Sequence, residues 1–169
     1  MCLTTKKANC FRYAKKDIIC YKIMYVLNMD DYSLSNEIKN SIITKSGTYI
    51  EFDESDLTKT DDGKRLFLTP YREVLINGDI INGKIPMRAE GKCHTFFVGN
   101  ERCIDSGYIH TFSYYPHSWL ENLDDKEVYR VFKCIIPKGT RYAAGVFNGR
   151  GYFGSYASKQ IKFLYEVTE

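Results

Sequence analysis

The sequence lacks the apolar runs that membrane-spanning and secreted proteins carry. Its longest apolar run, Ile18–Leu27, is interrupted by Lys22 and falls short of the ~20 residues that cross a bilayer. The first residues, MCLTTKKANCFRYAKK, contain no apolar core of a signal peptide. We therefore expect a cytoplasmic protein without a membrane partner.

The six cysteines lack the spacing of a disulfide framework or a metal site. None forms a C-x-x-C pair, and the acidic stretch 53–64 lacks the alternating oxygen ligands of a calcium loop. The metal-capable residues Cys93, His94, Cys103, His110 and His117 are too irregularly spaced to predict zinc. We expect reduced, mostly buried thiols, no metal and no other cofactor. A nucleophilic Cys93 or Cys103 activated by His94 or His110 stays open, because spacing does not report contact in space.

The chain also lacks repeats, low-complexity tracts and linker-like segments. Its 169 residues suit a single domain, 1–169, with residues 1–16 as a loosely docked basic arm. Aromatic residues make up 15% of the sequence, with 14 Tyr and 10 Phe, a composition typical of β-rich proteins.

Several stretches predict strands. Asp17–Leu27 is apolar on both alternating faces and is expected to be the central strand. Toward the C-terminus, Val128–Ile136, Thr140–Phe147 and Ile161–Val167 are separated by Pro137-Lys138-Gly139 and by Asn148-Gly149, a hairpin signal. The shorter runs RLFLT, REVLI and DII within Arg65–Ile85 predict further hairpins.

Helix signals are sparse. Ser113 as an N-cap, Pro116 in the first turn, and the apolar spacing of Trp119, Leu120 and Leu123 predict a helix over about Tyr115–Leu123. A second, short helix is expected near Tyr32–Lys39. The fold class predicted is α+β, mainly antiparallel twisted β-sheet with one or two short helices.

A glycine-rich loop is expected after the hairpin signal. Between Gly149 and Tyr156, three glycines interleave with one arginine and three aromatic residues. Glycines allow close backbone approach, arginine fits phosphate, and aromatic faces stack on bases. The alternative is a hairpin tip whose aromatic side chains fold back on the sheet and whose arginine is solvated.

Basic charge gathers in the same third of the chain. Lys126–Lys162 contains eight Lys or Arg and one acid, a net charge of +7, whereas Glu51–Asp62 carries −5. An anionic ligand is therefore favoured. The candidate ligand-binding residues are Arg141, Arg150 and Lys159 for phosphates, Tyr152, Phe153 and Tyr156 for a base, and His110 for one hydrogen bond. No residue is assigned a catalytic role.

The segments ICYKI, GYIHTFS, VFKCIIPKGTRY and YASKQIKFL together resemble a group of short uncharacterised proteins from gut bacteria and their phages. More remotely, a strand ending in HTFS and leading into a helix is similar to the core of ADP-ribosyltransferase-like folds. That family places a catalytic glutamate on a later strand. Here Ser158-Lys159-Gln160 stands where acids would be needed, so this resemblance implies binding rather than turnover.

The function predicted is non-catalytic binding and sequestration of a small anionic nucleotide-derived ligand, as a phage-encoded anti-defence sponge for an immune signalling nucleotide. One alternative is a transferase or hydrolase that acts on a nucleotide through His110 with Glu127 or Asp105. Another is an inhibitor that binds a protein through an aromatic surface. Long nucleic acids are disfavoured, since the net charge is only +3. A homo-oligomer stays open, because a ligand enclosed between subunits is better shielded from water.

Overall fold

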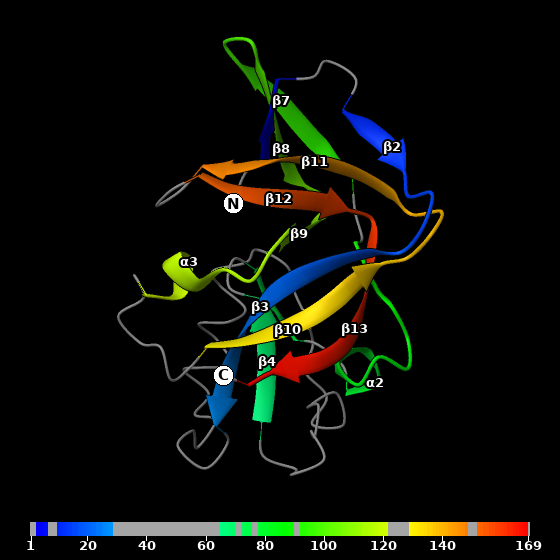
Figure 1. Ribbon diagram of the computed structural model, residues 1–169, viewed down its shortest axis with the longest axis vertical. Coiled ribbons are helices and arrows are strands. Elements are labelled where there is room, and N and C mark those ends of the chain that lie inside the picture. Colours follow the sequence, from blue (N-terminus) through cyan, green and yellow to red (C-terminus); the bar gives the residue numbers. More distant parts are fainter. Residues whose placement is uncertain are drawn as a thin grey trace.

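The computed structural model describes residues 3–6, 10–28, 65–69, 72–75, 78–89, 92–121, 129–148 and 152–168 (Figure 1). These residues form a 13-stranded antiparallel sheet and two short helices, α2 (Gly78–Ile81) and α3 (His117–Glu121). The predicted α+β class, dominated by antiparallel sheet, is confirmed. Neither described helix has the length and apolar character needed to cross a bilayer.

The strands follow one another along the chain as β1 (Leu3–Thr5), β2 (Phe11–Tyr13), β3 (Ile18–Asn28), β4 (Arg65–Thr69), β5 (Arg72–Leu75), β6 (Met87–Arg88), β7 (His94–Val98), β8 (Glu101–Ser106), β9 (Ile109–Phe112), β10 (Tyr129–Ile136), β11 (Arg141–Asn148), β12 (Tyr152–Ser158) and β13 (Gln160–Val167). Their order across the sheet is β6-β13-β10-β3-β9-β12-β11-β1-β8-β7. In addition, β2 pairs with β11, β4 with β3, and β5 with β4.

Strand β3 is central, as its apolar character on both faces predicts. It pairs with β10 from Ile18 to Tyr25, with β9 at Tyr21, and with β4 from Tyr25 to Asn28. Figure 1 shows β11 and β12 on one side of β9, and β3 with β10 on the other. Strand β9 therefore joins the part of the sheet that contains β3 and β10 to the part that contains β11 and β12.

The C-terminal strands follow their turn signals. The Pro137–Gly139 turn joins β10 to β11, with Gly139 at φ +84°. Strands β11 and β12 then pair from Tyr142 opposite Ser158 to Asn148 opposite Tyr152, as the Asn-Gly hairpin signal predicts. The tip, residues 149–151, lies outside the described residues.

Four expectations differ from the structure. The glycine-rich segment is not a loop over its described part, since Tyr152–Ser158 forms β12. Residues 1–16 are not a loose arm where they are described, because β1 and β2 pair with the sheet and Leu3 is fully buried. The run DII lies in α2 instead of a strand. The helix predicted at Tyr115 begins at His117, because the Pro116 carbonyl accepts the first helical N–H bonds.

Two further expectations are not tested by the described residues. The second helix, near Tyr32–Lys39, and the acidic stretch both lie outside them. The division of the chain into a single domain stays a prediction.

Strand β3 contributes buried side chains to both faces of the sheet. Because side chains alternate across a strand, Cys20 and Met24 point to one face and Ile23 to the other. The first face carries a core that we call the inner core: Ala14, Cys20, Met24, Ile81, Ile109, Phe132, Cys134, Ile136, Tyr142, Ile161 and Phe163. The other face carries the outer core, which α3 covers with Trp119: Ile23, Phe112, Trp119, Val131, Phe147 and Phe153.

Candidate functional site

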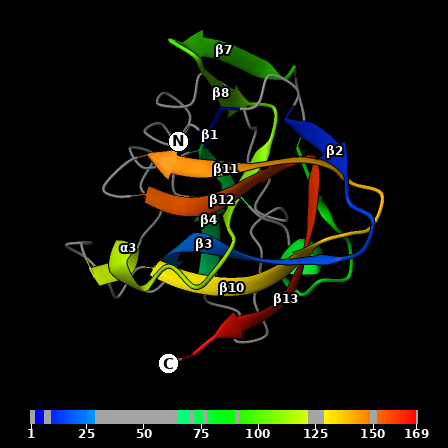
Figure 2. The same cartoon turned by 45° about the horizontal axis from the view of Figure 1, so that its top comes forward.

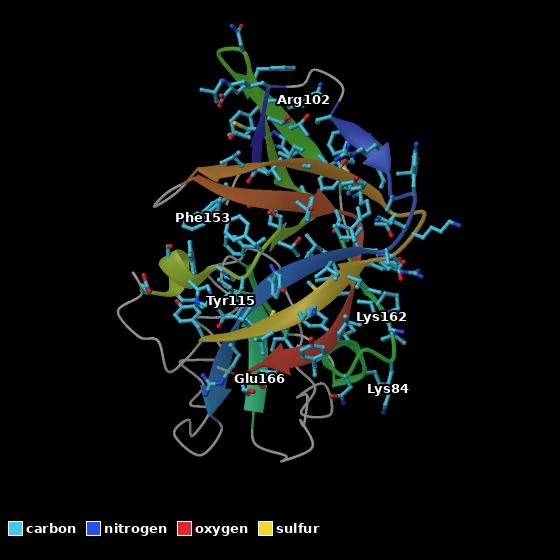
Figure 3. The ribbon with its side chains drawn as sticks, viewed as in Figure 1. Lys84, Arg102, Tyr115, Phe153, Lys162 and Glu166 are labelled. Carbon is cyan, nitrogen blue, oxygen red and sulfur yellow. The ribbon has the colours of Figure 1, made fainter. Side chains whose placement is uncertain are left out.

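Two of the aromatic residues predicted to bind a base, Phe153 and Tyr156, pack against the cores of the sheet. Phe153 is buried in the outer core, edge-on to Phe112 with ring centroids 5.9 Å apart. Figure 3 shows it on the same side of β12 as α3 and Tyr115. A ring buried in this way is closed to a base arriving from solvent.

Tyr156 lies on the opposite face of β12, three residues away. Its ring is edge-on to Tyr142 at 6.0 Å beside the inner core, and burial raises the pKa of its hydroxyl. Phe153 and Tyr156 therefore cannot stack on one base, since a strand sends positions of odd separation to opposite faces. Arg150 and the side chain of Tyr152 lie outside what the structure describes.

His110, on β9, is part of the buried polar structure. Its Nε2 lies 2.9 Å from the Asp105 carbonyl oxygen. Burial lowers the pKa of His110 to about 4, so the ring is neutral near pH 7 and Nε2 donates to that carbonyl. The Asp105 carboxylate faces a different ring, with Oδ2 3.7 Å from His94 Nδ1. His110 Nε2 is therefore bonded to the main chain of Asp105, whereas the ion pair of the Asp105 carboxylate is with His94.

Lys22 joins His110 to the inner core. Its side chain is buried on the inner face of β3, and Nζ donates to the His110 carbonyl oxygen at 3.1 Å. Burial lowers the pKa of Lys22 to about 8, while the neighbouring Cys134 and Cys20 raise it in part. Lys22 neither reaches an anion at the surface nor extends its ammonium into solvent.

Arg141 and Lys159 are the two predicted residues that the structure brings together. Arg141 opens β11, Lys159 lies between β12 and β13, and the Lys159 N–H donates to the Arg141 carbonyl at 3.0 Å. Figure 2 shows β2, the start of β11 and the β12–β13 junction at one end of the sheet. Two cationic side chains thus leave from adjoining backbone at that end.

The side chains of Arg141 and Lys159 each make a cation–π contact with an aromatic ring. Arg141 Cζ lies 4.5 Å from the ring centroid of Phe11, and Lys159 Nζ lies 4.7 Å from that of Tyr108. Phe11 and Tyr108 stack on each other at 5.0 Å and 19°. Tyr13, 69% exposed, is paired directly opposite Arg141. We call Phe11, Tyr13, Tyr108, Arg141 and Lys159 the cation–aromatic surface.

A thiol lies against this surface. Cys93 is exposed, and its Sγ is 3.9 Å from the Gly107 carbonyl oxygen, which also accepts from Lys159 Nζ at 2.6 Å. Partial burial alone raises the pKa of Cys93. Hydrogen bonds from Lys159 and Tyr108, with the charges of Lys159 and Arg141, outweigh that effect and lower the pKa below its usual range.

Gly107 explains why Cys93 comes so close. Its φ is +76°, and a Cβ there would lie 2.6 Å from the Lys92 carbonyl oxygen and 2.7 Å from Cys93 Cα. Only glycine permits this approach without a backbone shift. Strand alternation in β2 and β11 likewise places Phe11 diagonal to Arg141 on one face.

Sequence reasoning missed Phe11, Tyr13 and Tyr108 because they reach the site through pairing between distant strands. Cys93 was considered only with a histidine base, whereas its described neighbours are a lysine and a tyrosine. The available signal was the +7 segment, which contains Arg141 and Lys159. No group of three metal-capable side chains occurs among the described residues.

Comparisons with known proteins do not add a relative: no family model, curated protein or solved structure matches this chain.

Proposed function

We propose that this protein binds a small anionic, nucleotide-derived ligand at the cation–aromatic surface and releases it unchanged. The observation that carries the proposal is the meeting of Arg141 and Lys159 on adjoining backbone beside exposed Tyr13. A guanidinium offers a planar fork of donors to phosphate, an ammonium adds a compact charge, and an open tyrosine ring can stack on a base.

The arrangement of the surface favours binding over conversion. The side chains that form it are two cations, three aromatic rings and the neighbouring Cys93 thiol, with no carboxylate among these described residues. Transfer at a nicotinamide ribose needs a carboxylate to stabilise the developing positive charge. Holding without turnover is what a sponge for a signalling nucleotide requires, and a phage anti-defence role in the cytoplasm belongs to this proposal.

The first experiment measures thermal unfolding of the full chain against mononucleotides, cyclic dinucleotides, NAD and ADP-ribose. A ligand at 100 times its dissociation constant adds roughly 2.7 kcal/mol and raises Tm by several degrees. The ligand is then recovered from denatured protein and identified by mass. Intact ligand supports the binder, and altered product supports an enzyme.

A matched pair of arginine variants locates the site. Arg141→Gln should abolish the shift, while Arg102→Gln should keep it. The two arginines are comparable because Arg102 also covers a phenylalanine, with Cζ 5.0 Å from the Phe97 centroid, on β8. Equal loss in both variants would show a nonspecific charge effect, and no shift across the panel would overturn the proposal.

A second candidate function, binding to a protein, is favoured by β7. This strand ends the sheet order, and consecutive residues Phe96, Phe97 and Val98 are 38%, 60% and 60% exposed. Exposed apolar edge strands are sites for strand addition by another chain. A partner that wild-type protein captures and Phe97→Ser does not would place this function first.

A further inference from the structure

The described cysteines fall into two classes. Cys10, Cys20, Cys103 and Cys134 are buried, and only Cys93 is exposed among the five. Burial raises the pKa of Cys20 to about 12 and raises that of Cys134 further above its usual range. A thiol that keeps its proton and has no access to solvent does not react, since the thiolate is the nucleophile.

Cys93 lies in a cluster of groups that favour its anion. The Gly107 carbonyl fixes Lys159 Nζ at 2.6 Å and contacts Cys93 Sγ at 3.9 Å, so ammonium and sulfur meet at one backbone oxygen. Lys159 Nζ also lies 4.7 Å from the Tyr108 ring centroid. The thiol, ammonium and phenol thus occupy one small region anchored by Gly107.

Lys159 and Tyr108, the two partners of Cys93, both stabilise its anion. Lys159 and Tyr108 both hydrogen-bond Cys93 and lower its pKa against the opposing effect of partial burial. Burial, and then the bond to Cys93, raise the pKa of Tyr108 to about 12. The tyrosine therefore stays protonated near pH 7 and can donate to the sulfur anion.

We propose that the Cys93–Lys159–Tyr108 cluster is a redox modification site, at which Cys93 reacts with hydroperoxides to form a sulfenic acid. An exposed thiol whose anion is favoured by neighbouring cationic groups has the reactivity and access that this oxidation needs. The inference goes beyond the proposed function and does not rest on it, because no ligand takes part.

The reaction is balanced by the groups in the cluster and the peroxide. The Cys93 sulfur attacks the hydroxyl oxygen of the hydroperoxide, an S–O bond forms, and the O–O bond breaks. The other oxygen leaves with the electron pair and takes a proton from the Lys159 ammonium, which water restores. Sulfur loses two electrons, and the peroxide gains them.

The test begins with reduced full-length protein, hydrogen peroxide and dimedone, which traps sulfenic acids. Peptide mass mapping should find the adduct at Cys93 well before Cys10, Cys20, Cys103 or Cys134. Adducts that appear on the buried cysteines at the same rate would overturn the proposal, and so would an unmodified Cys93.

The pH dependence of alkylation tests the cluster itself. Iodoacetamide labelling of wild-type Cys93 should have an apparent pKa below the ~8.5 of an unperturbed thiol. Lys159→Met should raise that pKa and slow labelling at pH 7 about five- to tenfold, while Lys159→Arg should restore most of the rate. Tyr108→Phe should slow it less.

Thermal unfolding of each variant separates a lost contact from lost folding. A folded Lys159→Met protein that labels at the wild-type rate and pH dependence would overturn the proposal. Anion binding is measured separately by ligand-induced shifts in Tm, so failure of one proposal is distinguishable from failure of the other.

Discussion

Two lysine–cysteine neighbourhoods in this molecule have opposite electrostatics. On the inner face of β3, Lys22 lies among Cys20 and Cys134, and burial lowers the pKa of the lysine while it raises those of both thiols. At the cation–aromatic surface, Lys159 lies beside Cys93, and the thiol pKa is lowered. The same residue types meet in both places, so desolvation decides which form is stable.

The two neighbourhoods also differ in how accessible their thiols are. In the inner neighbourhood the two thiols are buried and keep their protons, and the buried lysine loses its proton at a lower pH than usual. In the surface neighbourhood the lysine is half-buried and the thiol is exposed. Buried polar groups are tolerated where they find hydrogen bonds, as Lys22 does at the His110 carbonyl. Thiol reactivity is therefore expected at Cys93 and not at Cys20 or Cys134.

The largest difference between the regions should appear in packing. Phe163 is 1% exposed and meets Phe132 edge-on at 5.4 Å, so Phe163→Ala should lower the free energy of unfolding by about 3–5 kcal/mol. Phe11 of the cation–aromatic surface is only half-buried, so Phe11→Ala should lower the free energy of unfolding by less. Urea denaturation of both variants measures the difference, and equal losses would break the distinction between inner core and surface.

Lys22 should give the inner region a distinctive pH dependence. Its pKa is lowered from 10.5 to about 8 in the fold, so between those values the unfolded chain binds more protons and stability rises with pH. The gain approaches roughly 3 kcal/mol for this buried group. It should appear as a rising difference in free energy of unfolding between wild type and Lys22→Met from pH 8 to 10.5.

A flat difference across that range would show that Lys22 is charged or solvated in the fold. Lys159→Met is the matched control at the surface. That variant removes a half-buried lysine that contacts a carbonyl and a ring, and it leaves the buried Lys22 in place.

Gly107 gives a sharper test of how the surface cluster is held. Gly107→Ala places a Cβ 2.6 Å from the Lys92 carbonyl oxygen, whereas Gly139→Ala, at a similar positive φ, meets nothing within 4 Å. Gly139→Ala should lower the free energy of unfolding by about 1 kcal/mol, because alanine is strained at a positive φ. Gly107→Ala should lower the free energy of unfolding by more than that. It should also slow alkylation of Cys93, because residues 92 and 93 must move.

Equal stability losses and an unchanged Cys93 rate would show that close approach at Gly107 does not position the thiol. Denaturant unfolding and timed alkylation of the two alanine variants provide both readouts.

Sequence patterns predicted the strands well where alternation and turn chemistry agree. β3, β10 and the β11–β12 hairpin follow from apolar runs, from Pro137 and Gly139, and from Asn148-Gly149. The failure at β12 has a physical cause: the glycines of this segment suggested a loop, but Gly154 lies inside a paired strand. A glycine in the sequence can indicate a turn, but it can also lie inside a strand where another group approaches the backbone closely.

The candidate site was only partly predictable for a related reason. Arg141 and Lys159 are close in space because β11 and β12 pair, which the hairpin signal implied. Tyr108 and Phe11 reach the same place through pairings across long stretches of chain, and no local pattern encodes those. Strand β12 also separates Phe153 from Tyr156, which composition alone grouped together.

The smallest expected effect links the two properties of the surface. A phosphate held by Arg141 and Lys159 would bring negative charge near Cys93, raise its pKa, and slow its alkylation at pH 7 on the order of a few-fold. The labelling rate of Cys93 with and without inorganic phosphate, at ionic strength matched with chloride, measures this. Arg141→Gln should remove the phosphate effect, and Arg102→Gln should keep it. If phosphate binds by an independent measurement and the Cys93 rate does not change, the anion lies elsewhere than beside Lys159, because a charge there must act on the thiolate.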